Sequence, residues 1–349
     1  TRLAGFSKVI KTEDPASPLN RTISHYHQGN DSNSGQGEYD DHISKVGKKY
    51  REEIYDSNWN LQKKVINTWD KLPLSNGRHF VRLANTLESI YDGNSSHKDR
   101  AESFGYDADN GNKIEITSWG EVNGQDNGVF IDTGSDKYLT TIVYASNPTN
   151  YVIGLPAYEL IKDQSETKIK ETLYYYDGLG FAQVDKGNRT MDQFWRAGSK
   201  YIDIERTYNN HGLVISEKDA RDKESFYAYD IYNLYPLTIT NPLSQVTTYE
   251  YDYSSGQPTR TIDPNNRSYY TDYDGLDRVI AERQPDVSNP TVSLAKISYE
   301  YVDTPNAVRT KKIDHLDANN AVETYTYFDG LGRKIQERQE AETSGLFNV

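Results

Sequence analysis

One pattern is written three times between residues 227 and 283: Tyr229-Asp230-Ile231-Tyr232-Asn233, Tyr251-Asp252-Tyr253-Ser254-Ser255-Gly256 and Tyr273-Asp274-Gly275-Leu276-Asp277-Arg278. The tyrosines that open the three copies are 22 residues apart. Self-similarity at a fixed period of roughly 20–50 residues indicates a repeat architecture. The repeat unit, and not any single residue, therefore decides the fold class.

Each copy has the chemistry of a tight β-hairpin turn. Asp or Asn starts such a turn by hydrogen-bonding its own main chain, and a following Gly or Asn takes the left-handed conformation that the turn requires. The same signature recurs elsewhere in the chain. The predicted repeat-turn residues are Tyr176, Asp177, Gly178, Gly180, Tyr208, Gly212, Tyr229, Asp230, Tyr251, Asp252, Gly256, Tyr273, Asp274, Gly275, Arg278, Tyr327, Asp329, Gly330, Gly332 and Arg333.

A second kind of turn alternates with the first, at Asn241-Pro242 and Asp263-Pro264. Proline presets its own backbone dihedral and cannot donate to a central ladder, so it marks the ends of strands. Between the turns, period-two alternation predicts strands at Val246–Tyr251, Pro258–Ile262 and Ser268–Tyr273. The sequence thus predicts an all-β fold, a long meander of antiparallel strands with very little helix.

Tyrosine is the unusual component of the chain. There are 29 tyrosines, while only 35% of the residues are hydrophobic, against about 45–50% in ordinary globular domains. A tyrosine ring covers a sheet face while its hydroxyl stays hydrated or hydrogen-bonded. Because side chains alternate along a strand, Tyr249 and Tyr251 must share a face. Stacked at 22-residue intervals, such positions are expected to form tyrosine ladders across neighbouring strands.

Composition excludes several classes of protein. The net charge is -13 with dispersed Lys and Arg, which disfavours nucleic-acid binding. An aromatic content of 12% with regular periodicity disfavours disorder. The chain contains no run of 18 apolar residues, so no transmembrane helix is predicted. The chain has no Cys, which removes disulfides, thiol catalysis and zinc sites built on cysteine.

The chain is expected to form a single elongated domain, residues 1–349. Residues 1–164 contain degenerate repeats broken by Gly/Asn/Asp/Ser-rich insertions, and residues 165–349 contain regular repeats. Because the sequence begins with Thr1 and not with Met, we expect it to be part of a longer protein.

Several groups of residues have spacings that could carry chemistry. His25 and His27 lie on one face of a predicted strand with His42 in a nearby loop, which is compatible with a metal site, although strand histidines of this kind are usually structural. The segments at Asp107-Ala108-Asp109-Asn110-Gly111 and Asp126-Asn127-Gly128 echo calcium loops but lack the closing glutamate. We therefore expect neither a metal nor a cofactor.

Carboxylate pairs occur at Glu52-Glu53, Asp107/Asp109 and Glu337/Glu340, and glycoside hydrolases use two carboxylates. With 52 acidic residues, such pairs are expected by chance. The Glu340-Ala341-Glu342 segment imitates the Glu-x-Glu of ADP-ribosylating toxins but has no nucleotide-binding context. The glycines of Gly178-Leu179-Gly180 precede no helix, so they are turn glycines and not a phosphate loop. We therefore expect no enzymatic activity.

The tyrosine motifs carry a resemblance to a known family. Tyr174-Tyr175-Tyr176-Asp177-Gly178-Leu179-Gly180, Tyr273-Asp274-Gly275-Leu276-Asp277-Arg278 and Phe328-Asp329-Gly330-Leu331-Gly332-Arg333 resemble the YD repeats of the RHS-repeat superfamily. The opening, Ala4-Gly5-Phe6-Ser7-Lys8-Val9 followed by His25-Tyr26-His27-Gln28-Gly29-Asn30, is similar to the segment that enters the repeat shell in the B component of insecticidal toxin complexes and in SpvB-like proteins.

The resemblance implies a spiral ribbon of antiparallel strands that forms part of a hollow shell around a C-terminal toxic polypeptide. The segment itself would be non-catalytic wall in a secreted or cell-surface toxin system. Its partners would be the remainder of the shell, the enclosed polypeptide and other toxin-complex components. The alternative is a teneurin-like extracellular scaffold for adhesion or glycan binding, built from the same repeats.

Overall fold

The computed structural model describes residues 5–12, 20–29, 41–74, 77–285, 293–304, 307–315, 321–329, 331–341 and 346–348. Within these residues the chain forms strands joined by turns, and the 3-10 turn η2 (Ile43–Lys45) is a short helical segment between β2 and β3. Every described strand pairing is antiparallel, as for β17 (Val246–Tyr251), β18 (Pro258–Ile262) and β19 (Ser268–Tyr273). The predicted all-β antiparallel fold is confirmed, and these three strands have the predicted bounds.

The chain divides into two compact units, residues 1–203 and residues 204–349. Strand β13 (Lys200–Tyr208) contributes residues to both. The regular repeats predicted from residue 165 onward therefore begin within unit 1. The prediction of one elongated domain stays a prediction.

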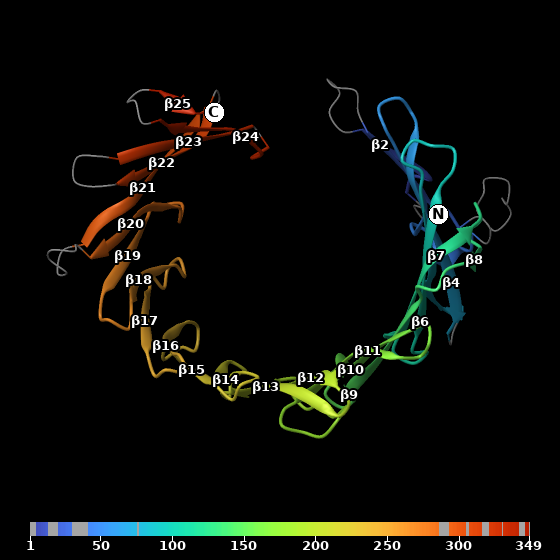
Figure 1. Cartoon of the computed structure of the whole chain (residues 1–349), viewed down its shortest axis with the longest axis horizontal. Coiled ribbons are helices and arrows are strands. Elements are labelled where there is room, and N and C mark those ends of the chain that lie inside the picture. Colours follow the sequence, from blue (N-terminus) through green and yellow to red (C-terminus); the bar gives the residue numbers. More distant parts are fainter. Residues whose placement is uncertain are drawn as a thin grey trace. The chain divides into compact units, whose positions relative to one another are not determined.

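Unit 1 is built from long strands. They are β1 (Lys8–Thr12), β2 (Arg21–Tyr26), β3 (Lys49–Tyr55), β4 (Leu61–Pro73), β5 (His79–Ile90), β6 (Lys98–Tyr106), β7 (Lys113–Gly124), β8 (Phe130–Asp132), β9 (Tyr138–Asn147), β10 (Val152–Asp163), β11 (Lys168–Tyr176) and β12 (Arg189–Ala197). Strands that follow one another in the chain pair with each other, except that β7 pairs with both β8 and β9. Figure 1 shows β8 beside β7.

The β7–β8 hairpin adds a local second layer to unit 1. A Cβ atom on Gly124 would lie 2.7 Å from Leu87 Cδ1, and one on Gly128 would lie 3.1 Å from Ile66 Cγ2. The hairpin therefore rests on β4 and β5, where only glycine permits so close an approach. Beneath it lies a core cluster of Ile66, Leu87, Ala101 and Val122, with Trp119 and Phe130 packed against it.

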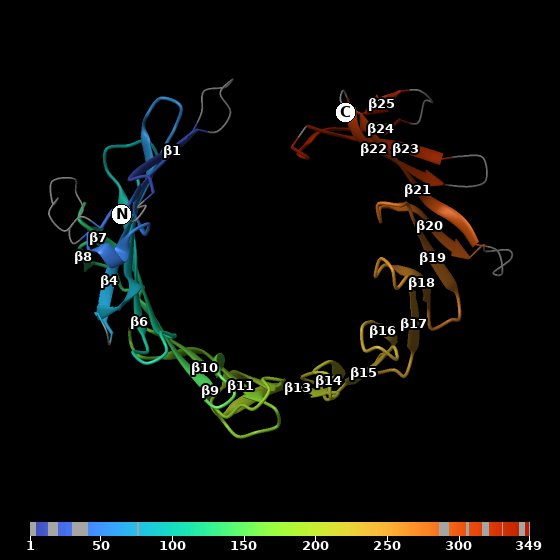
Figure 2. The same cartoon turned by 180° about the vertical axis from the view of Figure 1, so that it is seen from behind.

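Unit 2 is built from shorter strands. After β13 they are β14 (Val214–Lys218), β15 (Glu224–Tyr229), β16 (Pro236–Thr240), β17, β18, β19, β20 (Val279–Pro285), β21 (Ser293–Thr304), β22 (Ala307–His315), β23 (Ala321–Phe328), β24 (Lys334–Glu340) and β25 (Phe347–Asn348). Each pairs with the next, and both views show β14 to β20 following one another in chain order (Figures 1 and 2).

Unit 2 has almost no buried core. Among its described residues, Ala281 is the one fully buried hydrophobic side chain, at 7% exposure. Most strand residues are half-buried, as in a sheet that presents both faces. Hydrogen bonds and tyrosine contacts must therefore contribute much of the order in this unit.

Candidate functional site

The turn after an anchoring tyrosine is closed by its own aspartate. The Asp274 N–H donates to the Arg278 carbonyl (2.9 Å), and the Asp277 N–H donates to the Asp274 carbonyl (3.0 Å). Asp274 Oδ1 also accepts from the N–H groups of Leu276 (2.9 Å) and Arg278 (3.0 Å). This is a type I turn followed by one left-handed residue, a common three-residue hairpin loop. Separately from the loop, the strand register shifts next to the tyrosine, between Asp272 and Tyr273, where Ile280 is the extra residue of a β-bulge.

The arginine of the motif completes the turn. Arg278 Nε donates to Asp274 Oδ2, and Arg333 Nε donates to Asp329 Oδ2, both at 2.7 Å. Backbone N–H groups, together with these guanidinium groups, hold the pKa of both carboxyls below the usual range. The two aspartates therefore serve as ionised caps of their turns at neutral pH.

The left-handed residue is not always the predicted glycine. Gly178, Gly212, Gly256 and Gly332 have positive φ angles of 69°, 78°, 77° and 76°. In the turn closed by Asp274, however, Asp277 takes this conformation (φ 59°) and Gly275 does not. Asp and Asn tolerate the left-handed region because their short side chains bond locally. Gly180 lies in a loop without a positive φ, and Gly330 lies outside the described residues.

The anchoring tyrosines join strands through their hydroxyls. The three bonds are Tyr229 Oη to the Val214 carbonyl (2.9 Å), Tyr251 Oη to the Pro236 carbonyl (3.2 Å) and Tyr273 Oη to the Pro258 carbonyl (3.0 Å). In each case the tyrosine is the last residue of its strand, and it donates a hydrogen bond to the first residue of the preceding strand. We call these three bonds the tyrosine clamps. Tyr176 and Tyr301 also donate to backbone carbonyls, those of Pro156 and Val279.

The clamps form a continuous series. The proline whose carbonyl accepts a bond from one anchoring tyrosine is paired, across a hairpin, with the anchoring tyrosine of the preceding copy. Pro236 pairs with Tyr229, and Pro258 pairs with Tyr251. The predicted stacking of one anchor ring on the next is wrong, since no ring pair joins Tyr229 to Tyr251 in the described part of the chain. Tyr251 stacks instead on Tyr235, with ring centroids 4.7 Å apart. One strand lies between the strands of consecutive anchors. The anchor rings are therefore too far apart for contact, but each hydroxyl reaches the strand in between.

Tyr208 ends β13 at a register shift, as the three clamp tyrosines end their strands. The last copy departs from this arrangement. Tyr327 lies one residue before the end of β23, because Phe328 separates it from Asp329. The Arg338 guanidinium lies 5.4 Å from the Tyr327 ring centroid. This last anchor is therefore held by a cation–π contact.

The copy at Tyr176 contains the longest turn. Asp177 Oδ2 accepts from the backbone N–H groups of Asp185 (2.8 Å), Lys186 (2.9 Å) and Gly187 (2.9 Å), and Oδ1 accepts from that of Asn188 (2.9 Å). Burial opposes ionisation of Asp177, but these four bonds outweigh it and hold its pKa below the usual range. The loop closes over a second core cluster, formed by Ala145, Ala157, Tyr176 and Val184.

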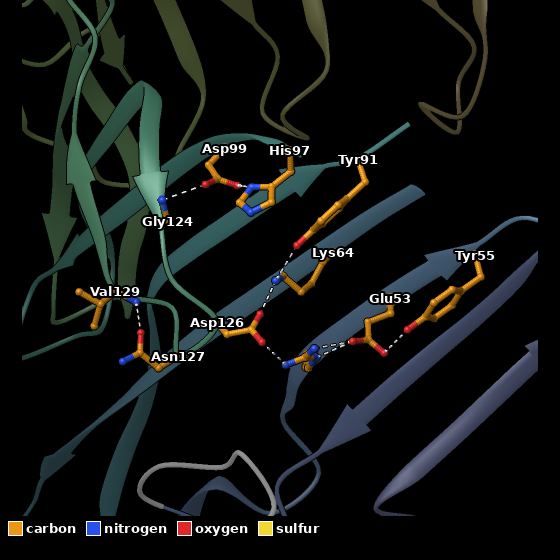
Figure 3. A network of polar contacts seen from close by, with 11 residues as sticks. Glu53, Tyr55, Lys64, Tyr91, His97, Asp99, Gly124, Asp126, Asn127 and Val129 are labelled. Atoms are coloured by element: carbon orange, nitrogen blue, oxygen red, sulfur yellow. Dashed lines mark hydrogen bonds and ion pairs between the residues drawn. The ribbon is translucent and has the colours of Figure 1, made fainter. Parts of the chain in front are cut away.

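A polar network that no motif revealed fastens the β7–β8 hairpin (Figure 3). Lys64 on β4 has a side chain only 7% exposed, and its Nζ donates to Tyr91 Oη (3.0 Å) and to Asp126 at the hairpin tip. Burial favours the neutral amine, but the bonds to Asp126 and Tyr91 outweigh it and raise the Lys64 pKa. The hydrogen bond from Lys64 lowers the pKa of Asp126. Both groups are therefore charged at neutral pH.

The network continues onto β3. Arg51 Nη1 lies 3.9 Å from Asp126 Oδ2, and Arg51 Nε donates to Glu53 Oε1 (2.8 Å). Tyr55 Oη donates to the other oxygen of Glu53 (3.1 Å). Negative and positive groups thus alternate from β3, through Asp126 at the hairpin tip, to Lys64 on β4, as Figure 3 shows.

A second set of contacts to the β7–β8 hairpin comes from β6. Asp99 accepts the Gly124 N–H (2.8 Å), and its other oxygen lies 2.6 Å from His97 Nδ1. The His97 ring packs on Tyr91, with ring centroids 4.6 Å apart. The hairpin is therefore held at the end of β7, next to the turn, by Asp99 and at its tip by Lys64. The sequence did not reveal this site, because Lys64 and Asp126 are 62 residues apart. The Asp126-Asn127-Gly128 segment was considered only as a calcium loop, and Lys64 belongs to no motif.

The histidines considered for a metal site have other neighbours. His25 and His27 contact the Tyr50 ring, at 6.0 and 5.0 Å between centroids, and burial lowers the His25 pKa. The His42 ring packs edge-on against His79 at 4.6 Å. In the described ranges, no group of three or more His, Cys, Asp or Glu side chains could hold a metal ion. Glu342 lies outside the described residues.

Two hollows lie on the sheet of unit 1. One, of about 370 Å³, is lined by Glu88, Arg100 and Glu102 among others. The second, of about 570 Å³, contains Asp107 and Glu115. Burial opposes ionisation of Glu88, but its pairs with Arg100 and Lys63 lower its pKa. A glycosidase acid needs a raised pKa, so the Glu88 environment does not favour that chemistry.

Comparison with known proteins gives matches at the level of fold. No protein-family model and no curated protein matches the chain. The crystal structure of TcdB2-TccC3-TEV matches with a TM-score of 0.71 and 10% identity, covering 98% of this chain and 27% of that one. TcdB2-TccC3 without its hypervariable C-terminal region matches with a TM-score of 0.70 and 10% identity, over 97% and 27%.

A Tc holotoxin pore of Photorhabdus luminescens, with a mutated TccC3, matches with a TM-score of 0.72, 10% identity and the same coverage, 97% and 27%. The chain thus spans about a quarter of the length of the proteins it matches. In the described residues, no helix is long and apolar enough to cross a membrane. The resemblance carried by the tyrosine motifs is confirmed: the chain has the fold of a region of the TcdB2-TccC3 toxin-complex structures.

Proposed function

We propose that this chain is a wall segment of a secreted RHS/YD-repeat shell that encloses a toxic polypeptide, and that the segment is not catalytic. The observation that carries the proposal is the match of 96–98% of the chain to TcdB2-TccC3 structures. The partners would be the rest of the shell, the enclosed polypeptide and other toxin-complex components.

The construction of unit 2 supports a role as wall. A sheet with one fully buried hydrophobic side chain among its described residues cannot rely on a packed core. From β14 to β19, the tyrosine clamps and the aspartate-closed turns instead bond the backbone at the strand ends. Such a ribbon is ordered although each face is available to solvent or to an enclosed chain.

The distribution of charge also suits a wall. Lys and Arg side chains pair with carboxylates across neighbouring strands, for example Arg260 with Glu250 (2.8 Å) and Arg283 with Asp272 (2.6 Å). Each such pair has no net charge of its own, and the excess of carboxylates gives the whole chain a net charge of -13.

Protease protection tests the proposal on the full-length protein. The polypeptide that follows the shell should resist a protease in the native protein. It should become cleavable when Tyr229, Tyr251 and Tyr273 are all replaced by Phe, which removes the three clamps. Tyr232→Phe is the control, since Tyr232 is 66% exposed and belongs to no clamp. Rapid cleavage in the native protein, or a full-length protein that adheres to cells and encloses nothing, would contradict the proposal.

A further inference from the structure

The β3–β4 turn has an aromatic residue at its left-handed position. Other turns closed by Asp have polar residues there, such as Asn233, Asn266 and Asp277. Asp56 closes this turn, because its N–H donates to the Asn60 carbonyl (3.0 Å) and its carbonyl accepts from the Trp59 N–H (3.2 Å). The left-handed position is therefore Trp59, with φ 64°. A bulky side chain in this region is an outlier. Strained residues of this kind cluster at functional sites.

The Trp59 ring is fixed in place yet lies in solvent. The Arg21 guanidinium lies 4.4 Å from its centroid, and the Tyr55 ring lies at 5.7 Å, tilted by 57°. Trp59 nevertheless remains 54% exposed. An indole held by a cation and a second ring, with much of its surface in water, is a preorganised stacking surface.

The polar groups next to the indole are mainly uncharged carboxamides. Asn60 Nδ2 donates to Asp56 Oδ2 (2.9 Å), and Gln62 Nε2 donates to the same oxygen (3.3 Å). Asp56 Oδ1 accepts from the N–H groups of Asn58 and Asn60, each at 2.8 Å. The carboxylate of the turn itself, Asp56, is thus occupied by these bonds. Asn58 and Asn60 are both exposed.

We propose that Trp59, Asn58 and Asn60 form a binding site for a neutral saccharide. The C–H face of a sugar ring is apolar and fits the exposed indole, while carboxamides both donate to and accept from sugar hydroxyls. Among the described residues, Asp56 is bonded within the turn, and the Arg21 guanidinium lies over the indole with its Nη1 buried and without a hydrogen-bond partner. The exposed polar groups beside the ring are therefore carboxamides. The inference is independent of the shell proposal.

A protein partner is the competing occupant, since Trp, Tyr and Arg are the residues enriched at the energetic centres of protein interfaces. The carboxamides favour the saccharide. A protein interface surrounds its aromatic anchor with a wider contact area that excludes water, whereas a sugar ring needs only one stacking face and a few hydroxyl partners.

The test uses the full-length protein on an array of neutral and anionic glycans, followed by calorimetry with the strongest neutral hit. Trp59→Gly should weaken binding by about tenfold or more, the loss expected for an aromatic centre of binding. Its melting temperature should not fall, because glycine adopts the left-handed region without strain. Tyr151→Gly is the matched control: Tyr151 is also left-handed (φ 55°) and 81% exposed, and it lies in the β9–β10 turn. It should bind as the parent does.

Three results would overturn the inference. The first is a protein that retains no neutral glycan on the array. The second is equal affinity in the parent and Trp59→Gly, or an equal loss in Tyr151→Gly. The third is a protein partner that is lost on Trp59→Gly while no glycan binds, which would assign the surface to protein docking.

Discussion

Replacing Asp126 by Asn should loosen the β7–β8 hairpin without changing its shape. The substitution removes the charge opposite Lys64 and leaves a lysine whose side chain is 7% exposed without its ionic partner. Exposed ion pairs contribute about 0.2–1 kcal/mol, and breaking a fully buried pair costs about 3–5 kcal/mol. Because Asp126 itself is 70% exposed, we expect a loss of about 1–2 kcal/mol, between these limits.

The stability difference between the parent and Asp126→Asn should depend on pH in a defined direction. The Asp126 pKa is lowered in the folded protein by its bond to Lys64. The stabilisation is therefore fully present above the unfolded-state carboxyl pKa and is lost as the pH falls through the lowered folded-state value. The parent and Asp126→Asn should differ at neutral pH and converge in strong acid.

Hydrogen exchange at the hairpin amides and urea unfolding measure the effect. Glu166→Gln is the matched control, because Glu166 is also 70% exposed and pairs with a lysine, Lys162, whose side chain is 34% exposed. It should change stability by less than about 0.5 kcal/mol. Equal effects of the two substitutions, or a difference that persists unchanged into strong acid, would refute the reasoning.

Three other substitutions test the turns and the clamps by urea unfolding. Tyr251→Phe removes the bond to the Pro236 carbonyl and should lower stability by about 1 kcal/mol; an effect no larger than that of Tyr232→Phe would contradict the clamp. Gly212→Val places a β-branched residue at φ 78° and should lower stability by about 1–2 kcal/mol, whereas an unchanged midpoint would show that the turn rearranges freely. Asp177→Ala leaves four backbone N–H groups without their acceptor and should increase hydrogen exchange across loop 177–188; unchanged exchange would mean that water replaces the carboxylate fully.

Local chemistry made the fold predictable from the sequence. The three strands around Tyr251 appear with the predicted bounds, because a proline, a turn aspartate and strict alternation fix each end independently. The left-handed position was harder to assign. Gly275 looked suited to it, but the hydrogen bonds of Asp274 place that conformation three residues after the aspartate, at Asp277.

The contacts between distant residues could not be predicted. Which carbonyl a tyrosine hydroxyl reaches depends on the register of three strands, so stacking was expected where hydroxyl clamps occur. The pairing of Lys64 with Asp126 depends on a hairpin that folds onto β4, which alternation along β7 does not indicate. Trp59 was unremarkable in the sequence, because only the backbone reveals its left-handed conformation.

Electron cryomicroscopy of the full-length protein tests the central claim most directly. If the chain is shell wall, the map should show its strands as one layer of a closed wall, with weaker density for a polypeptide inside. A full-length protein in which these strands form an open, solid or adhesive module without an enclosed space would contradict the account.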